Sequence, residues 1–168
     1  MISLASIVPS MADILGEKPT TLIERQRALV RAGILKSLPG RGRGAGVIAS
    51  PESVAILIIS LLASTTLADA PDCTSALLKA GTLRECPLTG EMRFGNALAS
   101  VLSSPAISAR VDTVQAEQTH TMGQIHYGAD RTVFVGKSVP GSQIFTSRWV
   151  KGDTIRKIAA LLANEVLS

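Results

Sequence analysis

Apolar residues recur every three to four positions along much of the chain, and this period gives way to alternation after about residue 106. Helical spacing, bounded by capping residues, prolines and glycines, predicts helices over 3–15, 21–32, 52–63, 70–79, 92–104 and 155–167. Side chains that alternate between two faces predict strands over 119–128, 131–136 and 143–150. The expected fold class is therefore α+β, with a small antiparallel sheet and flanking helices in the second half.

The helix expected over 21–32 has one apolar and one polar side. Thr21 suits an N-cap, Glu24 completes a capping box, and Gly33 suits the left-handed position after the helix. The apolar side holds Leu22, Ile23, Leu29 and Val30, with Gln26 among them. The polar side holds Thr20, Glu24, Arg27 and Arg31, with Arg25 at its flank. Arginines, a hydroxyl and an acid that could accept from cytosine are groups that contact DNA bases, although an ordinary solvated helix face has the same composition.

A Gly/Arg segment, residues 37–46, follows this helix. Residues 34–36 are expected to form a short strand and residues 46–49 its antiparallel return. Between them, glycines alternate with Arg41, Arg43 and an alanine. Glycines allow a hairpin tip to approach another backbone closely, and arginines at such a tip can contact phosphates or the minor groove. A basic amphipathic helix followed by a basic hairpin is the layout of a winged helix-turn-helix.

Three motifs follow one another in the first 64 residues. They are TTLIERQRALVRAGIL at 20–35, the Gly/Arg segment, and SPESVAILIISLLA at 50–63. In this order they resemble the DNA-binding head of the MerR-type winged-helix superfamily, whose recognition helix, wing and following helix have similar starts and ends. Glu24 and Gln26 lie near the positions of the family's aromatic pair, and the long C-terminal coiled coil is absent. These differences favour a related prophage or mobile-element regulator.

The charge of the chain is unevenly distributed. Of 168 residues, 17 are lysine or arginine and 13 are aspartate or glutamate, which gives a formal net charge of +4. Residues 1–50 carry seven of the bases and three of the acids, whereas residues 51–168 carry ten of each. The whole positive excess therefore lies with the helix 21–32 and the Gly/Arg segment, where contact with nucleic acid would need it.

Candidate chemistry elsewhere in the chain is sparse. Cys73 and Cys86 are interpreted as two reduced thiols, because their spacing relative to His120 and His126 matches no zinc motif. Both histidines are expected on one face of the strand 119–128. No phosphate loop, nucleophile elbow or metal-ligand spacing is recognised, so we expect no enzymatic activity, no metal and no cofactor.

The aromatic content of 3% is low against a hydrophobic content of 46%, so the core must consist mainly of aliphatic side chains. Trp149 and Tyr127 are expected to be buried in packing, although they could also floor a ligand pocket. Small-molecule sensing by the C-terminal half is left open, and nothing specifies an effector. The longest apolar run, 54–59, is too short to cross a bilayer, so no membrane association is expected.

Three regions are expected: a winged helix-turn-helix DNA-binding domain over 1–64, a helical linker region over 65–91, and an α+β dimerisation or sensing domain over 92–168. The helix 52–63 is apolar on nearly every face and must be covered by the C-terminal region or by a second subunit. A homodimer is expected, because a small DNA-binding module rarely binds tightly alone and paired half-sites multiply its affinity.

The expected function is sequence-specific binding of double-stranded DNA by a transcriptional regulator of bacterial or phage type, located in the cytoplasm or nucleoid. Helix 21–32 would enter the major groove, and the Gly/Arg segment would contact the backbone or minor groove. The alternatives are an architectural or recombination-directionality factor that bends DNA, and a protein-interaction adaptor. The residues expected to contact DNA are Thr20, Thr21, Glu24, Arg25, Arg27, Arg31, Lys36, Arg41 and Arg43, with Arg25 and Lys36 on phosphates.

Overall fold

A computed structural model describes residues 2–38, 46–137 and 146–166 of the chain. The helices of these residues are α1 (Leu4–Leu15), α2 (Pro19–Arg31), α3 (Pro51–Ala63), α4 (Ala70–Lys79), α5 (Phe94–Ser103), α6 (Pro105–Ser108) and α7 (Gly152–Val166). The strands are β1 (Thr113–Glu117), β2 (Met122–Tyr127), β3 (Asp130–Val135) and β4 (Ser147–Lys151). The α+β class is confirmed, and every helix that the spacing predicts is present; the short α6 was not predicted.

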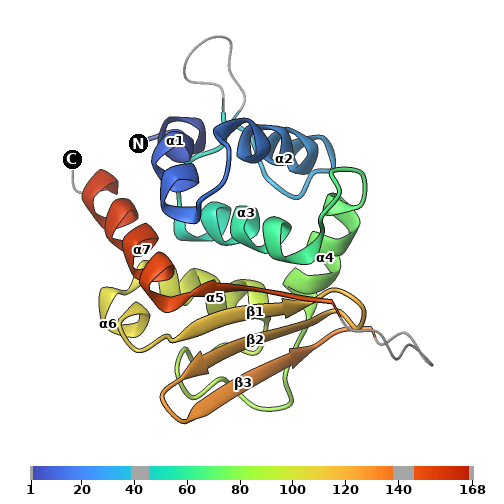
Figure 1. Cartoon of the computed structure of the whole chain (residues 1–168), viewed down its shortest axis with the longest axis vertical. Helices are drawn as coiled ribbons and strands as arrows, with labels where there is room; N and C mark the ends of the chain where they lie inside the picture. The colour runs from blue at the N-terminus through green and yellow to red at the C-terminus, as the bar shows by residue number, and fades with distance from the viewer. Residues whose placement is uncertain (1, 39–45, 138–145, 167–168) are drawn as a thin grey trace.

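The helices are stacked on one side of the sheet (Figure 1). α1 and α2 form the layer farthest from the sheet, and α3 runs beneath them with α4 at its end. α5 lies between α3 and the sheet, while α7 runs along one side of the molecule from β4 towards α1 (Figure 1). The helix predicted to bind DNA therefore lies at the opposite end of the molecule from the sheet.

Capping residues set the ends of α1 and α3 as their types predict. The Ser3 side chain accepts a hydrogen bond from the first turn of α1, and Gly16 ends that helix in the left-handed region with a φ of 69°. At the start of α3, Ser50 and Ser53 cap each other reciprocally, with Pro51 at the first helical position. These capping residues therefore determine both ends of α1 and the start of α3, the helices before and after α2 in the chain.

The start of α2 differs from the prediction. The helix begins at Pro19, and its N-cap, Lys18, makes no side-chain capping hydrogen bond. The capping box predicted from Thr21 and Glu24 is therefore wrong. Proline has no N–H to satisfy in the first helical turn and its φ is already helical, so the helix begins two residues before Thr21.

The strand pair predicted for 34–36 and 46–49 is also wrong. The backbone N–H groups of Ile34 and Leu35 both donate to Leu29 O at the end of α2, so they are not available to a neighbouring strand. Ile48 instead forms an isolated antiparallel bridge with Ser3, next to the start of α1. The segment that leaves the Gly/Arg region therefore pairs with the N-terminal end of the described chain.

α3 is the centre of the hydrophobic core. Most of its residues are buried, and it contacts α2, α4, α5, β1 and β4. One cluster of buried side chains runs from Leu4 in α1 through α3 to Leu162 in α7. The side chains that cover this apolar helix therefore come from the same chain, and they pack its N-terminal and C-terminal halves tightly together. Among helices of the described residues, none combines the length and hydrophobicity that crossing a membrane requires.

The sheet is antiparallel with the strand order β3-β2-β1-β4. Gly128 has a φ of 59°, in the tight turn between β2 and β3, where glycine adopts this conformation without strain. Gly123 of β2 leaves room for the ring of Phe94, which a Cβ at that position would meet at 2.5 Å. The side of the sheet that contains Gly123 therefore packs closely against α5.

Candidate nucleic-acid interface

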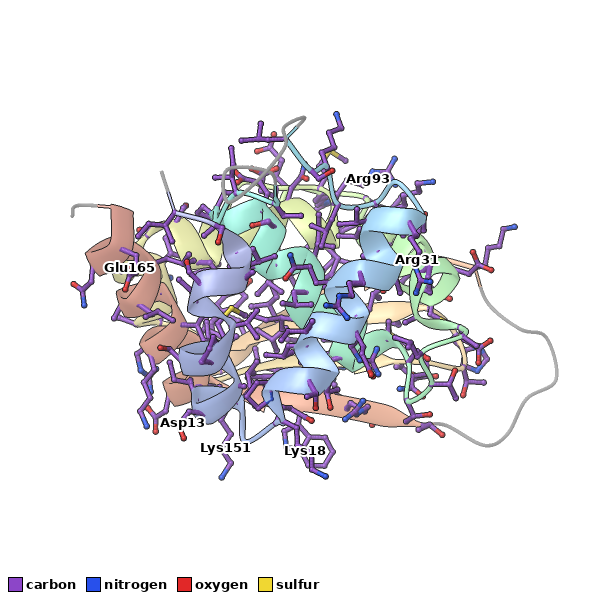
Figure 2. All side chains as sticks on the ribbon, turned by 90° about the horizontal axis from the view of Figure 1, so that it is seen from above. Asp13, Lys18, Arg31, Arg93, Lys151 and Glu165 are labelled. Carbon is purple, nitrogen blue, oxygen red and sulfur yellow. The ribbon has the colours of Figure 1, made fainter. Side chains whose placement is uncertain are left out.

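α1 and α2 fold back on each other through a short turn. Gly16 reverses the chain after α1, and the backbone N–H of Glu17 donates to Ala12 O at 2.9 Å. Lys18 is extended and leads directly into Pro19. Helices joined by a turn of this length with a glycine are typical of a helix-turn-helix. The connection places α2 at the surface of the outermost layer, beside α1 (Figure 2).

α2 packs on α1, α3 and α4 through one face and leaves the other in solvent. Its buried residues are Leu22, Arg25, Ala28 and Leu29. Its exposed residues include Thr20, Glu24, Arg27 and Arg31, whereas Thr21 is half-buried. Figure 2 looks down on this layer and shows Lys18 and Arg31 at opposite ends of the helix. The polar side expected from the sequence is therefore exposed, apart from Arg25.

Arg25 is only 5% exposed and does not reach the surface. Its Nη1 donates to Ser60 O at 2.5 Å, and its Nη2 donates to Ser64 O at 2.8 Å. Burial lowers the pKa of Arg25, the nearby Arg148 lowers it further, and Glu17 opposes the shift. The expected phosphate contact by Arg25 is therefore corrected: its guanidinium binds carbonyl groups at the C-terminal end of α3.

The end of α3 also receives donors from the sheet, which sequence reasoning did not identify. Arg148 of β4 donates to Leu61 O, and lies 3.5 Å from Ser64 O. Gln118, in the turn between β1 and β2, donates to Leu62 O at 3.1 Å. The last four carbonyls of a helix have no partner within it, so a buried helix end needs donors from elsewhere. Arg25, Arg148 and Gln118 meet this need.

A left-handed glycine ends α2, as predicted. Gly33 has a φ of 73°, and its N–H donates to Val30 O while that of Ile34 donates to Leu29 O. This pair of hydrogen bonds is the Schellman motif. The chain then continues to Lys36, which is exposed, and to Leu38, whose N–H donates to Gly46 O at 3.0 Å. The two ends of the Gly/Arg segment are thus held together beside α2.

The exposed face of α2 and the ends of the Gly/Arg segment line one cleft of about 610 Å³. Its lining residues are Glu24, Gln26, Arg27, Val30, Arg31, Ser37, Gly46, Val47 and Leu67. The cleft therefore brings together three of the residues predicted to contact DNA. Lys36 lines a neighbouring hollow with Ser37 and Val47, and Thr20 and Thr21 line neither. Arg41 and Arg43 lie outside the described residues.

The cysteines and histidines form no common site in the described part of the chain. No group of three His, Cys, Asp or Glu side chains lies there in a position to hold a metal. Burial raises the pKa of Cys73, with Asp69 and Asp72 adding to the shift. Burial alone would also raise the pKa of Cys86, but hydrogen bonds to Thr132, Thr89 and the local backbone lower it.

The expectation for the two histidines is wrong. His126 lies on β2, whereas His120 lies in the turn before it, because the strand begins only at Met122. His120 Nε2 is 3.9 Å from Glu117 Oε1. The histidines therefore do not share a strand face, and no reactive pair is formed.

Comparisons of the chain with protein-family models, with curated proteins and with solved structures find no match.

Proposed function

We propose that this chain binds double-stranded DNA through α2 and acts as a sequence-specific transcriptional regulator, with a head similar to MerR-type winged helix-turn-helix domains. The observation that carries the proposal is the cleft that joins the exposed side chains of α2 to both ends of the Gly/Arg segment. The uneven charge supports it, because the positive excess of the chain lies within its first 50 residues.

Arg27 and Arg31 have the chemistry for base recognition. Both are exposed, four residues apart, and therefore point from neighbouring turns of α2 in a similar direction. A guanidinium donates two parallel hydrogen bonds to guanine O6 and N7, which is the commonest specific contact in the major groove. Glu24, one turn earlier, is an acceptor suited to the amino group of cytosine. We assign these three residues to base contacts.

Lys36 and the Gly/Arg segment are assigned to the phosphate backbone. Lys36 is exposed, and it lines the hollow that adjoins the cleft. Contacts to phosphates orient a protein on the duplex without reading its sequence. A homodimer would place two such heads on paired half-sites, and we retain it as part of the proposal.

The first test is fluorescence anisotropy with duplex DNA selected from a randomised pool and with a scrambled duplex of equal length. A sequence-reading regulator is expected to prefer the selected duplex by a factor of about 10³, and log K should fall linearly with log salt. Salt-steep binding without preference would replace the regulator with an architectural DNA-binding protein. Absence of binding at low salt would refute the proposed DNA-binding function.

The second test compares the double variant Arg27→Ala/Arg31→Ala with Arg110→Ala. Arg110 is also an exposed arginine, but it follows α6 in the other half of the chain. The double variant is expected to lose most of the preference for the selected duplex, whereas Arg110→Ala should bind like the unmodified chain. Equal losses from both would show that only overall charge matters and would contradict the assigned base contacts.

A further inference from the structure

The sheet has a second face that points away from the helices. We call it the outer face. Its residues alternate with buried ones along β1, β2 and β3, and with the half-buried Arg148 and Val150 along β4. In Figure 1 this face is turned towards the viewer, with α5 behind the sheet. The strand registers arrange it in three rows across the sheet: Val135, Met122, Glu117 and Ser147; Val133, Gln124, Gln115 and Trp149; Arg131, His126, Thr113 and Lys151.

The outer face carries the single tryptophan of the chain in an exposed position. Trp149 is 61% exposed, so the expectation that it is buried in packing is wrong. It lies opposite Gln115 of β1, which in turn lies opposite Gln124 of β2. The middle row therefore places two amide side chains beside an exposed indole ring. Amide side chains hydrogen-bond to the edges of nucleic-acid bases, and an indole ring stacks on the flat faces of those bases.

A basic depression adjoins the β3 edge of this face. It measures about 490 Å³, and three cations line it: Lys79 from α4, Arg93 before α5, and Lys137 after β3. Val135 belongs both to the depression and to the first row of the outer face. Asp72 is the only acid that lines it in the described part of the chain. The depression is suited to a phosphate group next to the sheet.

Arg93 is held in place at this depression. Its Nη1 donates to Lys79 O at 2.5 Å. A Cβ at Gly81 would approach that Nη1 to 3.2 Å, so the glycine leaves room for the guanidinium against the backbone. One of its nitrogens is thus bound, while the side chain remains exposed. A fixed cation loses less freedom when it binds a phosphate than a mobile one does.

The remaining charges of the outer face also favour an anionic ligand. Arg131 and Lys151 are exposed at the two ends of the third row. Glu117 is the only acid in the three rows, and His120 lies beside it. The basic side chains at the two ends of the third row therefore outnumber the acids of the outer face.

We propose that the outer face binds single-stranded nucleic acid, with the phosphate backbone entering at the basic depression and a base stacking on Trp149. β3 and β4 are separated by about 14 Å across the sheet, so a short stretch of a few nucleotides spans it. Single-stranded ligands are favoured because only unpaired bases can present their flat faces to an exposed ring. This site is separate from the duplex site proposed on α2, and neither proposal depends on the other.

The test uses the fluorescence of Trp149, which reports on this face alone because the chain has no other tryptophan. The full chain is titrated with oligo(dT) and oligo(U) of 12 nucleotides at low salt. Quenching that saturates with either oligonucleotide is expected, and the ratio of the two affinities shows whether DNA or RNA is preferred. Absence of quenching with both would overturn the proposal.

Variants then locate the binding with labelled oligonucleotides and anisotropy. Trp149→Ala is expected to weaken binding about tenfold, whereas Trp149→Phe, which keeps a stacking ring, should retain most of it. Lys137→Gln should weaken binding and reduce its salt dependence. Leu83→Ala is the matched control, because Leu83 is 99% exposed but lies in the loop after α4, outside the three rows. Far-UV circular dichroism confirms that each variant is folded.

Two outcomes would refute the site on the sheet. Binding that is lost in Arg27→Ala/Arg31→Ala but unchanged in Trp149→Ala would place the single strand on α2. A Trp149 spectrum that changes with protein concentration in the absence of oligonucleotide, together with a dimer in sedimentation, would mean that a second copy covers the outer face. Loss of duplex binding alone refutes only the function proposed for α2, so the two failures are distinguishable.

Discussion

The two faces of α2 carry the same residue type in opposite environments. Arg25 is buried, and both ends of its guanidinium bind carbonyl oxygens of another helix. Arg27 and Arg31 are exposed and line a cleft at the surface. The position of an arginine on a basic helix therefore does not by itself specify whether the guanidinium binds within the protein or is available to a ligand. What decides it is whether a buried backbone group needs a donor at that place.

The carbonyl groups at the buried C-terminal end of α3 are the backbone groups that need a donor. α3 is apolar on nearly every face and its C-terminal half is buried, so its C-terminal carbonyls lie inside the molecule and not in water. Arginine is well suited to them because its fork can donate to two carbonyls at once. Its positive charge is also favourable at the negative end of a helix dipole. Arg25 thus joins α2 to α3, while Arg27 and Arg31 remain available to a ligand.

Replacement of Arg25 is expected to have the largest effect on stability. Arg25→Ala leaves the carbonyls of Ser60 and Ser64 short of a donor and opens a cavity, which should lower the free energy of unfolding by about 3–5 kcal/mol. Arg25→Lys should recover only part of it, because a single ammonium cannot reproduce the fork. Urea denaturation followed by circular dichroism measures the change.

Arg27→Ala is the matched control for this prediction. Arg27 lies on the same helix but is exposed, so its removal should change the free energy of unfolding by less than about 0.5 kcal/mol. Similar losses for Arg25→Ala and Arg27→Ala would contradict the division of α2 into a structural and an available face.

Arg148→Ala is expected to have the next largest effect, with a loss of about 1–3 kcal/mol. Arg148 is half-buried and donates to Leu61 O, beside the carbonyls that Arg25 binds. Because both arginines approach Ser64 O, their combined loss should differ from the sum of the two single losses by at least about 0.5 kcal/mol. A double-mutant cycle in urea measures this coupling; strict additivity would mean that the two arginines act independently.

Replacement of Lys36 distinguishes a phosphate contact from a base contact in the proposed DNA binding. Lys36→Ala is expected to weaken binding to selected and scrambled duplexes alike, by about 0.5–1 kcal/mol, and to reduce the salt slope by about one. Arg31→Ala should act mainly on the selected duplex. Anisotropy at several salt concentrations separates the two effects. A loss confined to the selected duplex in Lys36→Ala would assign Lys36 to a base instead.

The positions of helices could be predicted from the sequence because capping residues and periodicity are local. The burial of Arg25 could not be predicted in this way, although one signal was present. Leu22, Arg25 and Ala28 follow one another at spacings of three, so Arg25 lies within the face that these residues bury. The presence of Gln26 on the expected apolar side already indicated that this side was placed too far around the helix.

The remaining errors arise where the backbone pairs differently from what the pattern of residues predicts. The pairing of 34–36 with 46–49 fails because the end of α2 takes the N–H groups of Ile34 and Leu35. Trp149 was expected in the core because a chain with few aromatic residues usually buries them, yet its register opposite Gln115 places it on the outer face. The first outcome follows from the local end of α2, whereas the position of Trp149 depends on a strand partner that is remote in sequence, which neither periodicity nor composition reveals.

Glu24 provides the smallest and most specific change on the exposed face of α2. Among the described residues it is the only acid that lines the cleft, and its charge would repel the phosphates of any duplex bound there. Glu24→Gln removes this repulsion but retains a carbonyl that can accept from cytosine. Affinity for the scrambled duplex is therefore expected to rise about twofold while that for the selected duplex changes little, so the preference falls by the same factor.

Glu85→Gln is the matched control, because Glu85 is an exposed acid in the loop after α4, and this change should leave both affinities unchanged. If Glu85→Gln strengthens binding equally, the effect of Glu24 is one of net charge, and the cleft is not where the duplex lies.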